Sequence, residues 1–191
     1  PATPSSAAAS VSAVAPAGAP SQPLTDAEVR VLGCLIEKQI TTPEYYPLTL
    51  NALTNACNQK SNRNPAMTLE EKAVVRALDS LRDRKLVWMM TATGNRVPKY
   101  EHCFDKAYGL NAAEVALLCE LMLRGPQTAG ELRGHAERLC PIASIGEAEA
   151  VLSGLMNRPA GALVVRLPRQ AGRKEPRCAH LLAGPPQTPA E

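Results

Sequence analysis

The chain has 191 residues, of which 45% are hydrophobic and 3% aromatic, so it suits one or two small globular domains with aliphatic cores. The net charge of +3 identifies no partner by itself, and no apolar run approaches the roughly 20 residues needed to cross a membrane. Six cysteines without a CxxC pair argue against a zinc ribbon or a thioredoxin-like motif, and predict a reduced, cytoplasmic protein.

The two ends of the chain differ in composition from the rest. Residues 1–22 are rich in Ala, Pro and Ser and carry no charge, and they lack the basic start and unbroken apolar stretch of a secretory signal. We therefore expect a disordered tail there, and a second, shorter tail at 184–191.

Between the tails, one pattern occurs twice. LTDAEVRVLGCLIEK (24–38) matches LNAAEVALLCELMLR (110–124) at a constant offset of 86, and GNRVPKYEH (94–102) echoes GRKEPRCAH (172–180). Each copy of the first segment begins with a capping box, Thr25 with Glu28 and Asn111 with Glu114, and continues with apolar residues at helical spacing. The repeat predicts two copies of one structural unit.

The rest of each unit follows at shifting offsets. Second helices are expected over 48–57 and 128–139, and third helices from 68 and 144, with capping boxes formed by Thr128 and Glu131, Thr68 and Glu71, and Ser144 and Glu147. The offset between matching residues falls from 86 in the first helices to 79 in the second and 74 in the third. The first unit therefore has 86 − 79 = 7 extra residues before its second helix and 79 − 74 = 5 before its third, and we place both sets in loops.

After each third helix an apolar run, 86–90 or 162–167, leads to a turn with glycine, at Gly94 or Gly172, and then to a second extended stretch. Such a pattern predicts a β-hairpin. The fold class we expect is mainly α with small β-hairpins (α+β), as two tandem winged helix-turn-helix domains over 23–106 and 107–183. A plain helical bundle would leave both hairpins unexplained.

Three stretches carry a family resemblance: IEKQITTPEYYPLTLNALTNACNQKSNRNP (36–65), LRGPQTAGELR (123–133) and LPRQAGRKEPRCAHLL (167–182). Together they resemble the YceH family of bacterial proteins of unassigned biochemical function, over about residues 24–183. The resemblance implies tandem winged-helix folds, but it identifies no catalytic or binding residues in this chain and leaves the function open. The chain departs from the family at Cys178, where an aromatic residue is expected.

In a winged helix, the third helix commonly enters the major groove while the wing contacts phosphates or the minor groove. Residues 158–180 hold six Arg or Lys and one Glu, a local charge of 6 − 1 = +5 in a chain of +3. We therefore expect a non-enzymatic, regulatory protein that binds duplex DNA. The residues expected to contact phosphates are Lys60, Arg63, Arg76, Arg96, Lys99, Arg173, Lys174 and Arg177. The residues expected to contact bases or sugars are Asn58, Gln59 and Asn62.

Each of these interpretations has an alternative. The amides of 55–64 can instead cap the second helix and brace its turn, and the basic wings can be solvated hairpin faces. The third helix of the second unit carries Glu147 and Glu149, which would repel phosphate. The alternative function is a protein-interaction or scaffold module without nucleic-acid binding, with a homodimer or protein partner engaged through the second domain. Tyr45 and Tyr46 are expected to cover the end of a core, or else to form a partner site.

The sequence offers little for catalysis. It has no GxSxG, P-loop or HExxH motif, and its three histidines include His102 and His180 at the same repeat position, at an offset of 78. A catalytic site rarely occurs at both copies of a repeat, so we expect these two side chains to pack in the hairpins. No enzyme activity, cofactor or metal is expected.

Overall fold

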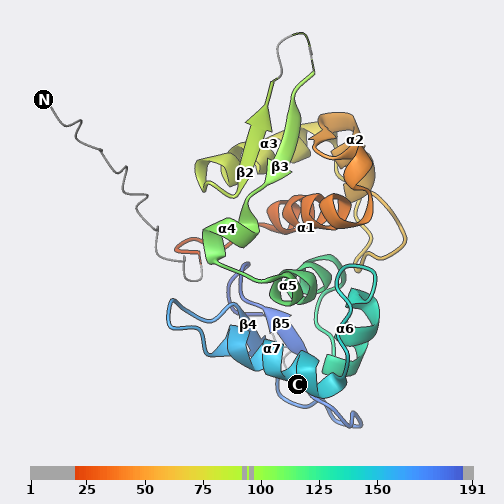
Figure 1. Ribbon diagram of the computed structural model, residues 1–191, viewed down its shortest axis with the longest axis vertical. Helices are drawn as coiled ribbons and strands as arrows, with labels where there is room; N and C mark the ends of the chain where they lie inside the picture. Colours follow the sequence, from red (N-terminus) through yellow and green to blue (C-terminus); the bar gives the residue numbers. More distant parts are fainter. Residues whose placement is uncertain (1–19, 92–93, 95–96, 187–191) are drawn as a thin grey trace, which may run out of the picture.

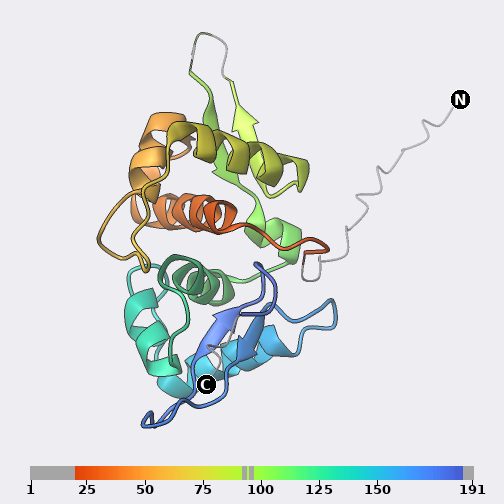
Figure 2. The same ribbon diagram turned by 180° about the vertical axis from the view of Figure 1, so that it is seen from behind.

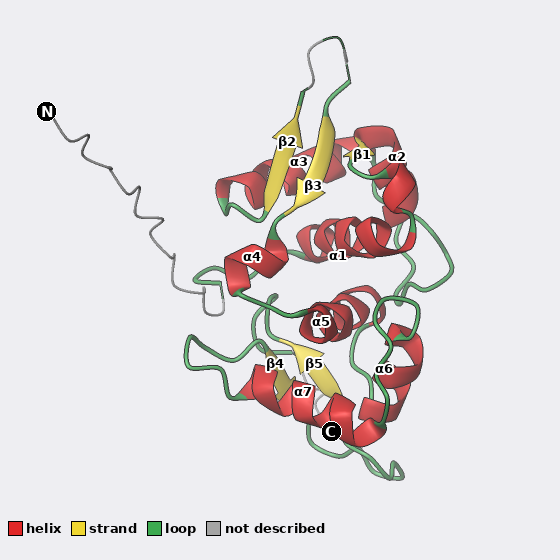
Figure 3. Ribbon diagram, in the orientation of Figure 1, coloured by secondary structure: helices red, strands yellow, loops and turns green. Residues whose placement is uncertain are grey.

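The computed structural model describes residues 20–91, 94 and 97–186 as a mixed α+β protein (Figure 1). Seven α-helices and two small antiparallel sheets lie in this part of the chain (Figure 3). The predicted tails, apart from residues 20–22 and 184–186, lie outside it. None of the helices in the described part is long and apolar enough to span a membrane.

The first half follows the order of elements that the sequence predicts, three helices and then a hairpin. Its elements are α1 (Asp26–Thr41), α2 (Leu50–Cys57), α3 (Glu71–Asp83), β2 (Val87–Met90) and β3 (Lys99–His102). The insertion after α1 forms a 3-10 turn (Pro43–Tyr45) and a short strand β1 (Leu48–Thr49), which extends the hairpin to a sheet of order β1-β3-β2.

The second half repeats that order without the insertion. Its elements are α5 (Ala112–Arg124), α6 (Ala129–Ala136), α7 (Ile145–Met156), β4 (Val164–Arg166) and β5 (Cys178–His180). The two hairpins share their register, because Val87 pairs with His102 and Val164 pairs with His180. A short helix, α4 (Phe104–Tyr108), joins the halves.

Three of the five predicted capping boxes are confirmed, at Thr25, Asn111 and Thr128. At α7, the Ser144 hydroxyl accepts from the Glu147 amide as expected, but the Glu147 carboxylate accepts from the amide one residue before Ser144.

The box predicted at Thr68 is wrong. Helix α3 begins two residues later than that box requires, with Glu70 at the N-cap and no side-chain cap. The backbone before α3 is instead held from a distance, because the Asn58 amide bonds both the N–H and the C=O of Leu69. A tertiary contact thus replaces the local cap.

Helices α1 and α5 lie against each other at the centre of the molecule and join the two halves (Figure 1; Figure 2 gives the view from behind). Residues 28–37 of α1 and 115–123 of α5 are buried without interruption. A surface helix would bury only one stripe, so each of these helices contacts its own unit on one side and the other unit on the other. The buried residues of both halves form one continuous hydrophobic core.

The two hairpins lie at opposite ends of the long axis. The β2–β3 hairpin extends from one end, and the loop between β4 and β5 lies at the other (Figures 1 and 2). Tyr46 covers the base of the first hairpin, since its hydroxyl accepts from the His102 amide at 2.7 Å, whereas Tyr45 is 74% exposed. The core-covering interpretation therefore fits Tyr46.

Candidate nucleic-acid interface

The turn between α2 and α3 is braced internally. Asn58 accepts from the Leu69 N–H at 2.7 Å and donates to the Leu69 C=O at 2.8 Å, which uses both ends of its amide. The side-chain amide oxygen (Oε1) of Gln59 accepts from the Arg63 guanidinium at 3.2 Å. These two amides, expected to contact bases or sugars, thus stabilise the turn in which they lie.

Arg63 points into the protein interior. Its side chain is fully buried, and it donates to the two Glu37 carboxylate oxygens at 2.6 and 3.1 Å and to the Ala56 carbonyl oxygen at 3.0 Å. Burial would lower the pKa of Arg63, but the bonds to Glu37 outweigh that effect and raise the pKa. A buried guanidinium bound in this way has no donors facing outward, so the interior ion pair replaces the expected phosphate contact.

The same ion pair continues across the boundary between the halves. Glu37 of α1 also accepts from Arg138, which follows α6, at 2.6 Å. Arg138 in turn pairs with Glu120 of α5 at 2.8 Å, and Glu120 pairs with Arg124 at 3.0 Å. Burial would raise the pKa of Glu37, but its hydrogen bonds and charge interactions with the two arginines lower the pKa. We name Glu37, Arg63, Glu120, Arg124 and Arg138 the interface network.

Two more residues of the predicted DNA-contact segment belong to this boundary. The Asn62 side-chain oxygen accepts from the Arg124 guanidinium, and the Asn64 backbone N–H donates to the Leu123 C=O at 2.9 Å. Asn62 also adopts a positive φ of 55°, a conformation that asparagine tolerates better than most residues. The segment after α2 therefore fastens the second half to the first.

The other cations expected in the first half have different positions. Lys60 and Arg76 are exposed, and Lys99 is half-buried in β3 opposite Met90. Arg96 lies outside the described residues. Among the predicted contacts of the first half, Lys60 and Arg76 are thus the cations that the structure places at the surface.

The second hairpin carries a run of exposed positive charge. Arg173 and Lys174 are exposed as expected, and Arg166 and Arg169 are exposed in the same segment. For these four side chains the described residues offer no carboxylate within 4.0 Å. We name Arg166, Arg169, Arg173 and Lys174 the basic loop. Arg166 and Arg169 are absent from the predicted contacts, although they belong to the positively charged residues of 158–180 on which the prediction of DNA binding was based.

Arg177 differs from the basic loop. It donates to the Pro126 carbonyl oxygen at 2.8 Å and pairs with Glu131 of α6 at 3.1 Å. Its guanidinium therefore holds the second hairpin against Pro126 and α6 of the same half.

The two equivalent histidines pack as expected. Burial lowers the pKa of both His102 and His180 from 6.5 to about 4, so both are neutral near pH 7. His102 Nδ1 accepts from the Phe104 N–H at 3.2 Å, which places the proton on Nε2, where it can be donated to Gln39 at 2.6 Å. Across residues 20–91, 94 and 97–186, His, Cys, Asp and Glu side chains form no group of three suited to a metal ion.

Comparisons with known proteins identify relatives along most of the chain. Residues 24–173 match the family described as "Protein of unknown function, DUF480". A UPF0502 protein of Geotalea uraniireducens is 61% identical over 164 residues, which cover 86% of this chain and 74% of the relative. A UPF0502 protein of Geobacter sulfurreducens is 60% identical over 168 residues (88% and 76%), and one of Opitutus terrae is 52% identical over 161 residues (84% and 70%). The chain therefore belongs to the DUF480/UPF0502 family of bacterial proteins.

Proposed function

We propose that this protein is a non-enzymatic, regulatory DNA-binding protein built from two winged-helix units. The basic loop of the second hairpin would make the main phosphate contacts. The observation that carries the proposal is the exposure of four cations within nine residues, 166–174, with no carboxylate of the described residues in pairing distance. Unpaired cations of this kind release counterions from DNA when they bind phosphates.

The order of elements in each half supports the winged-helix interpretation. Three helices followed by an antiparallel hairpin is the element order of that fold, and both halves have it. In the first half, Arg76 lies exposed on α3, the helix that would face the major groove. Lys60 would add a phosphate contact from the turn. In the second half, α7 exposes Glu147 and Glu149, so the hairpin and not α7 would approach the DNA.

The positions of the hairpins shape the expected mode of binding. Because they lie at opposite ends of the molecule, one short straight duplex would contact one of them at a time (Figure 1). Contacts to phosphates carry no sequence information by themselves. We therefore propose that the basic loop binds DNA with little sequence preference and that any sequence reading comes from α3.

The test is a fluorescence-anisotropy titration of a labelled mixed-sequence duplex at ~50 and ~200 mM salt. The double variant Arg173→Glu/Lys174→Glu should lose at least about tenfold in affinity at the lower salt, and its plot of log affinity against log salt should be less steep by about 2. The matched control, Lys85→Glu/Lys106→Glu, changes the net charge equally at exposed sites outside α3 and the basic loop. Equal losses in both variants, or no binding by the wild type at ~50 mM salt, would refute the proposal.

One observation favours the alternative function, a protein-interaction module. Three consecutive large side chains of β2 are exposed, Trp88 by 55%, Met89 by 40% and Met90 by 48%. Strand β2 is also an edge of its sheet, so its outer backbone groups are free to pair with another strand. Sedimentation velocity over a range of concentrations, with the variant Trp88→Ser/Met90→Ser beside the wild type, would detect self-association through this edge.

A further inference from the structure

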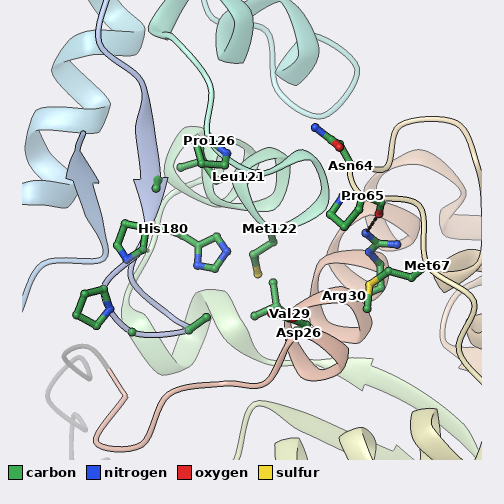
Figure 4. Close-up of a pocket in the computed structure, with 16 residues that line it drawn as sticks. Asp26, Val29, Arg30, Asn64, Pro65, Met67, Leu121, Met122, Pro126 and His180 are labelled. Carbon is green, nitrogen blue, oxygen red and sulfur yellow. Dashed lines mark hydrogen bonds between the residues drawn. The ribbon is translucent and has the colours of Figure 1, made fainter. Parts of the chain in front are cut away.

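A pocket of about 550 Å³ lies where the two halves meet, and the proposed DNA contacts do not use it. Its walls come from α1, from residues 64–67, from α5 and from residues 179–186, which include the end of β5 and the segment after it (Figure 4). A cavity of this volume is in the range of small-molecule sites. The pocket therefore draws on both halves of the repeat.

The lining combines aliphatic and polar side chains. Val29, Leu121 and Met122 supply aliphatic surface, and Figure 4 shows His180 on one side of Met122 and Arg30 on the other. The imidazole of His180 points toward Met122, and its Nδ1 is buried without a hydrogen-bond partner among the described residues. A buried polar atom without a partner is uncommon, and an absent ligand is one of its explanations.

Arg30 is a buried cation at the other side of the pocket. Only 2% of the residue is exposed, and it donates to the carbonyl oxygens of Cys57 at 3.1 Å and Pro65 at 2.6 Å. Its Nε has no partner, and no carboxylate of the described residues lies within 4.0 Å of its guanidinium. Carbonyl oxygens satisfy hydrogen bonds but do not neutralise the charge.

Among the residues that line the pocket, Arg30 carries the buried charge, because only 2% of it is exposed. Charges in a protein interior interact more strongly than in water, so this buried cation favours a bound anion. Asp26 also lines the pocket, but it is exposed, and water screens its charge.

We propose that this pocket binds a small organic carboxylate with an apolar body. The carboxylate lies on the Arg30 side, the body packs against Val29, Leu121 and Met122, and a polar substituent reaches His180. Because the ligand contacts both halves, its binding stabilises their junction. The site is separate from the basic loop, so this inference does not depend on DNA binding.

The five methionines give a direct test. Met67 and Met122 line the pocket, whereas Met89, Met90 and Met156 lie elsewhere. The probes are 2-naphthoate and its neutral isostere 2-naphthamide, titrated into the full chain with methyl-labelled methionine. We expect 2-naphthoate to shift the Met67 and Met122 resonances saturably, and 2-naphthamide to bind at least about tenfold more weakly, since a tenfold change corresponds to about 1.4 kcal/mol of charge interaction.

Two variants locate the site. Ala183 lines the pocket and is exposed, so Ala183→Trp should fold and should reduce 2-naphthoate affinity at least tenfold by filling the cavity. Ala150→Trp, at an exposed position of α7, is the matched control and should bind as the wild type does. The proposal is overturned if 2-naphthoate causes no saturable shift of Met67 and Met122, if the amide binds equally well, or if Ala183→Trp binds unchanged.

Discussion

Gly33 and Cys119 occupy equivalent positions of the two units, and they are in contact: the Cys119 thiol donates to the Gly33 carbonyl oxygen at 3.4 Å. The first helices of the two units, α1 and α5, thus pack against each other through equivalent positions of the repeat. The contact also explains the glycine, because a Cβ at position 33 would lie 2.9 Å from a Leu123 methyl carbon.

The first prediction concerns this close approach. Alanine usually stabilises a helix interior relative to glycine by about 1 kcal/mol. We expect Gly154→Ala, in α7 with no atom near the new Cβ, to show that gain. Gly33→Ala should fall short of it by about 1–3 kcal/mol because Leu123 and Met122 must move. Urea unfolding of both variants measures the difference, and equal shifts would contradict the packing at Gly33.

The second prediction concerns the interface network. Glu37 is 2% exposed and binds two arginines, so Glu37→Gln should destabilise the protein by about 3–5 kcal/mol through the uncompensated buried charge it leaves. The matched control is Asp79→Asn, which removes a carboxylate from the exposed pair with Arg82 and should change stability by less than about 0.5 kcal/mol. A loss in Glu37→Gln as small as that of the control would show that the network does not hold the halves together.

The third prediction separates bracing from DNA contact at Asn58. Asn58→Ala removes two hydrogen bonds from the Leu69 backbone and should cost about 1–3 kcal/mol of stability. Asn55→Ala, at an exposed position of α2, is the control and should cost less than about 0.5 kcal/mol. The DNA affinity of folded Asn58→Ala should stay within about twofold of the wild type, because its amide is already engaged; a large loss of affinity without loss of stability would reverse that assignment.

The fourth prediction concerns acid stability. Burial lowers the pKa of His102 from 6.5 to about 4, so the unfolded chain binds the proton more readily than the folded protein. The stability that neutral His102 contributes is therefore complete above about pH 6.5 and is lost as the pH falls toward 4, by about 3 kcal/mol at the lower limit.

Denaturant unfolding at several pH values between 7 and 4 measures this loss. The variant His102→Gln should depend less steeply on pH in that window, while the part due to His180 persists, since its pKa is lowered in the same way. Identical pH dependence of the wild type and the variant would show that His102 is not the group responsible. Glu37 affects stability in a lower pH range than the histidines. Its pKa is lowered in the folded protein, so the stability that the ionised carboxylate contributes is lost only as the pH falls through that pKa.

The sequence by itself determined the repeat, the order of three helices and a hairpin in each unit, and the capping boxes at Thr25, Asn111 and Thr128, because capping, periodicity and turn formation depend on residues close together in the chain. It did not predict β1 or α4. It failed at Thr68 because the backbone before α3 is held at Leu69 by Asn58, eleven positions earlier in the chain. A contact over that separation leaves no local pattern.

Only the tertiary structure decided which polar residues face solvent. The segment 55–64 is polar throughout, and its composition fits a DNA contact and a brace equally well. Packing of α1 against α2 placed Glu37 beside it, and a buried carboxylate requires a cation, so Arg63 turned inward. Arg169 and Arg173 are exposed, and no carboxylate of the described residues lies within 4.0 Å of either. Exposure of a charge is therefore a property of the assembled fold, which the order of residues does not display.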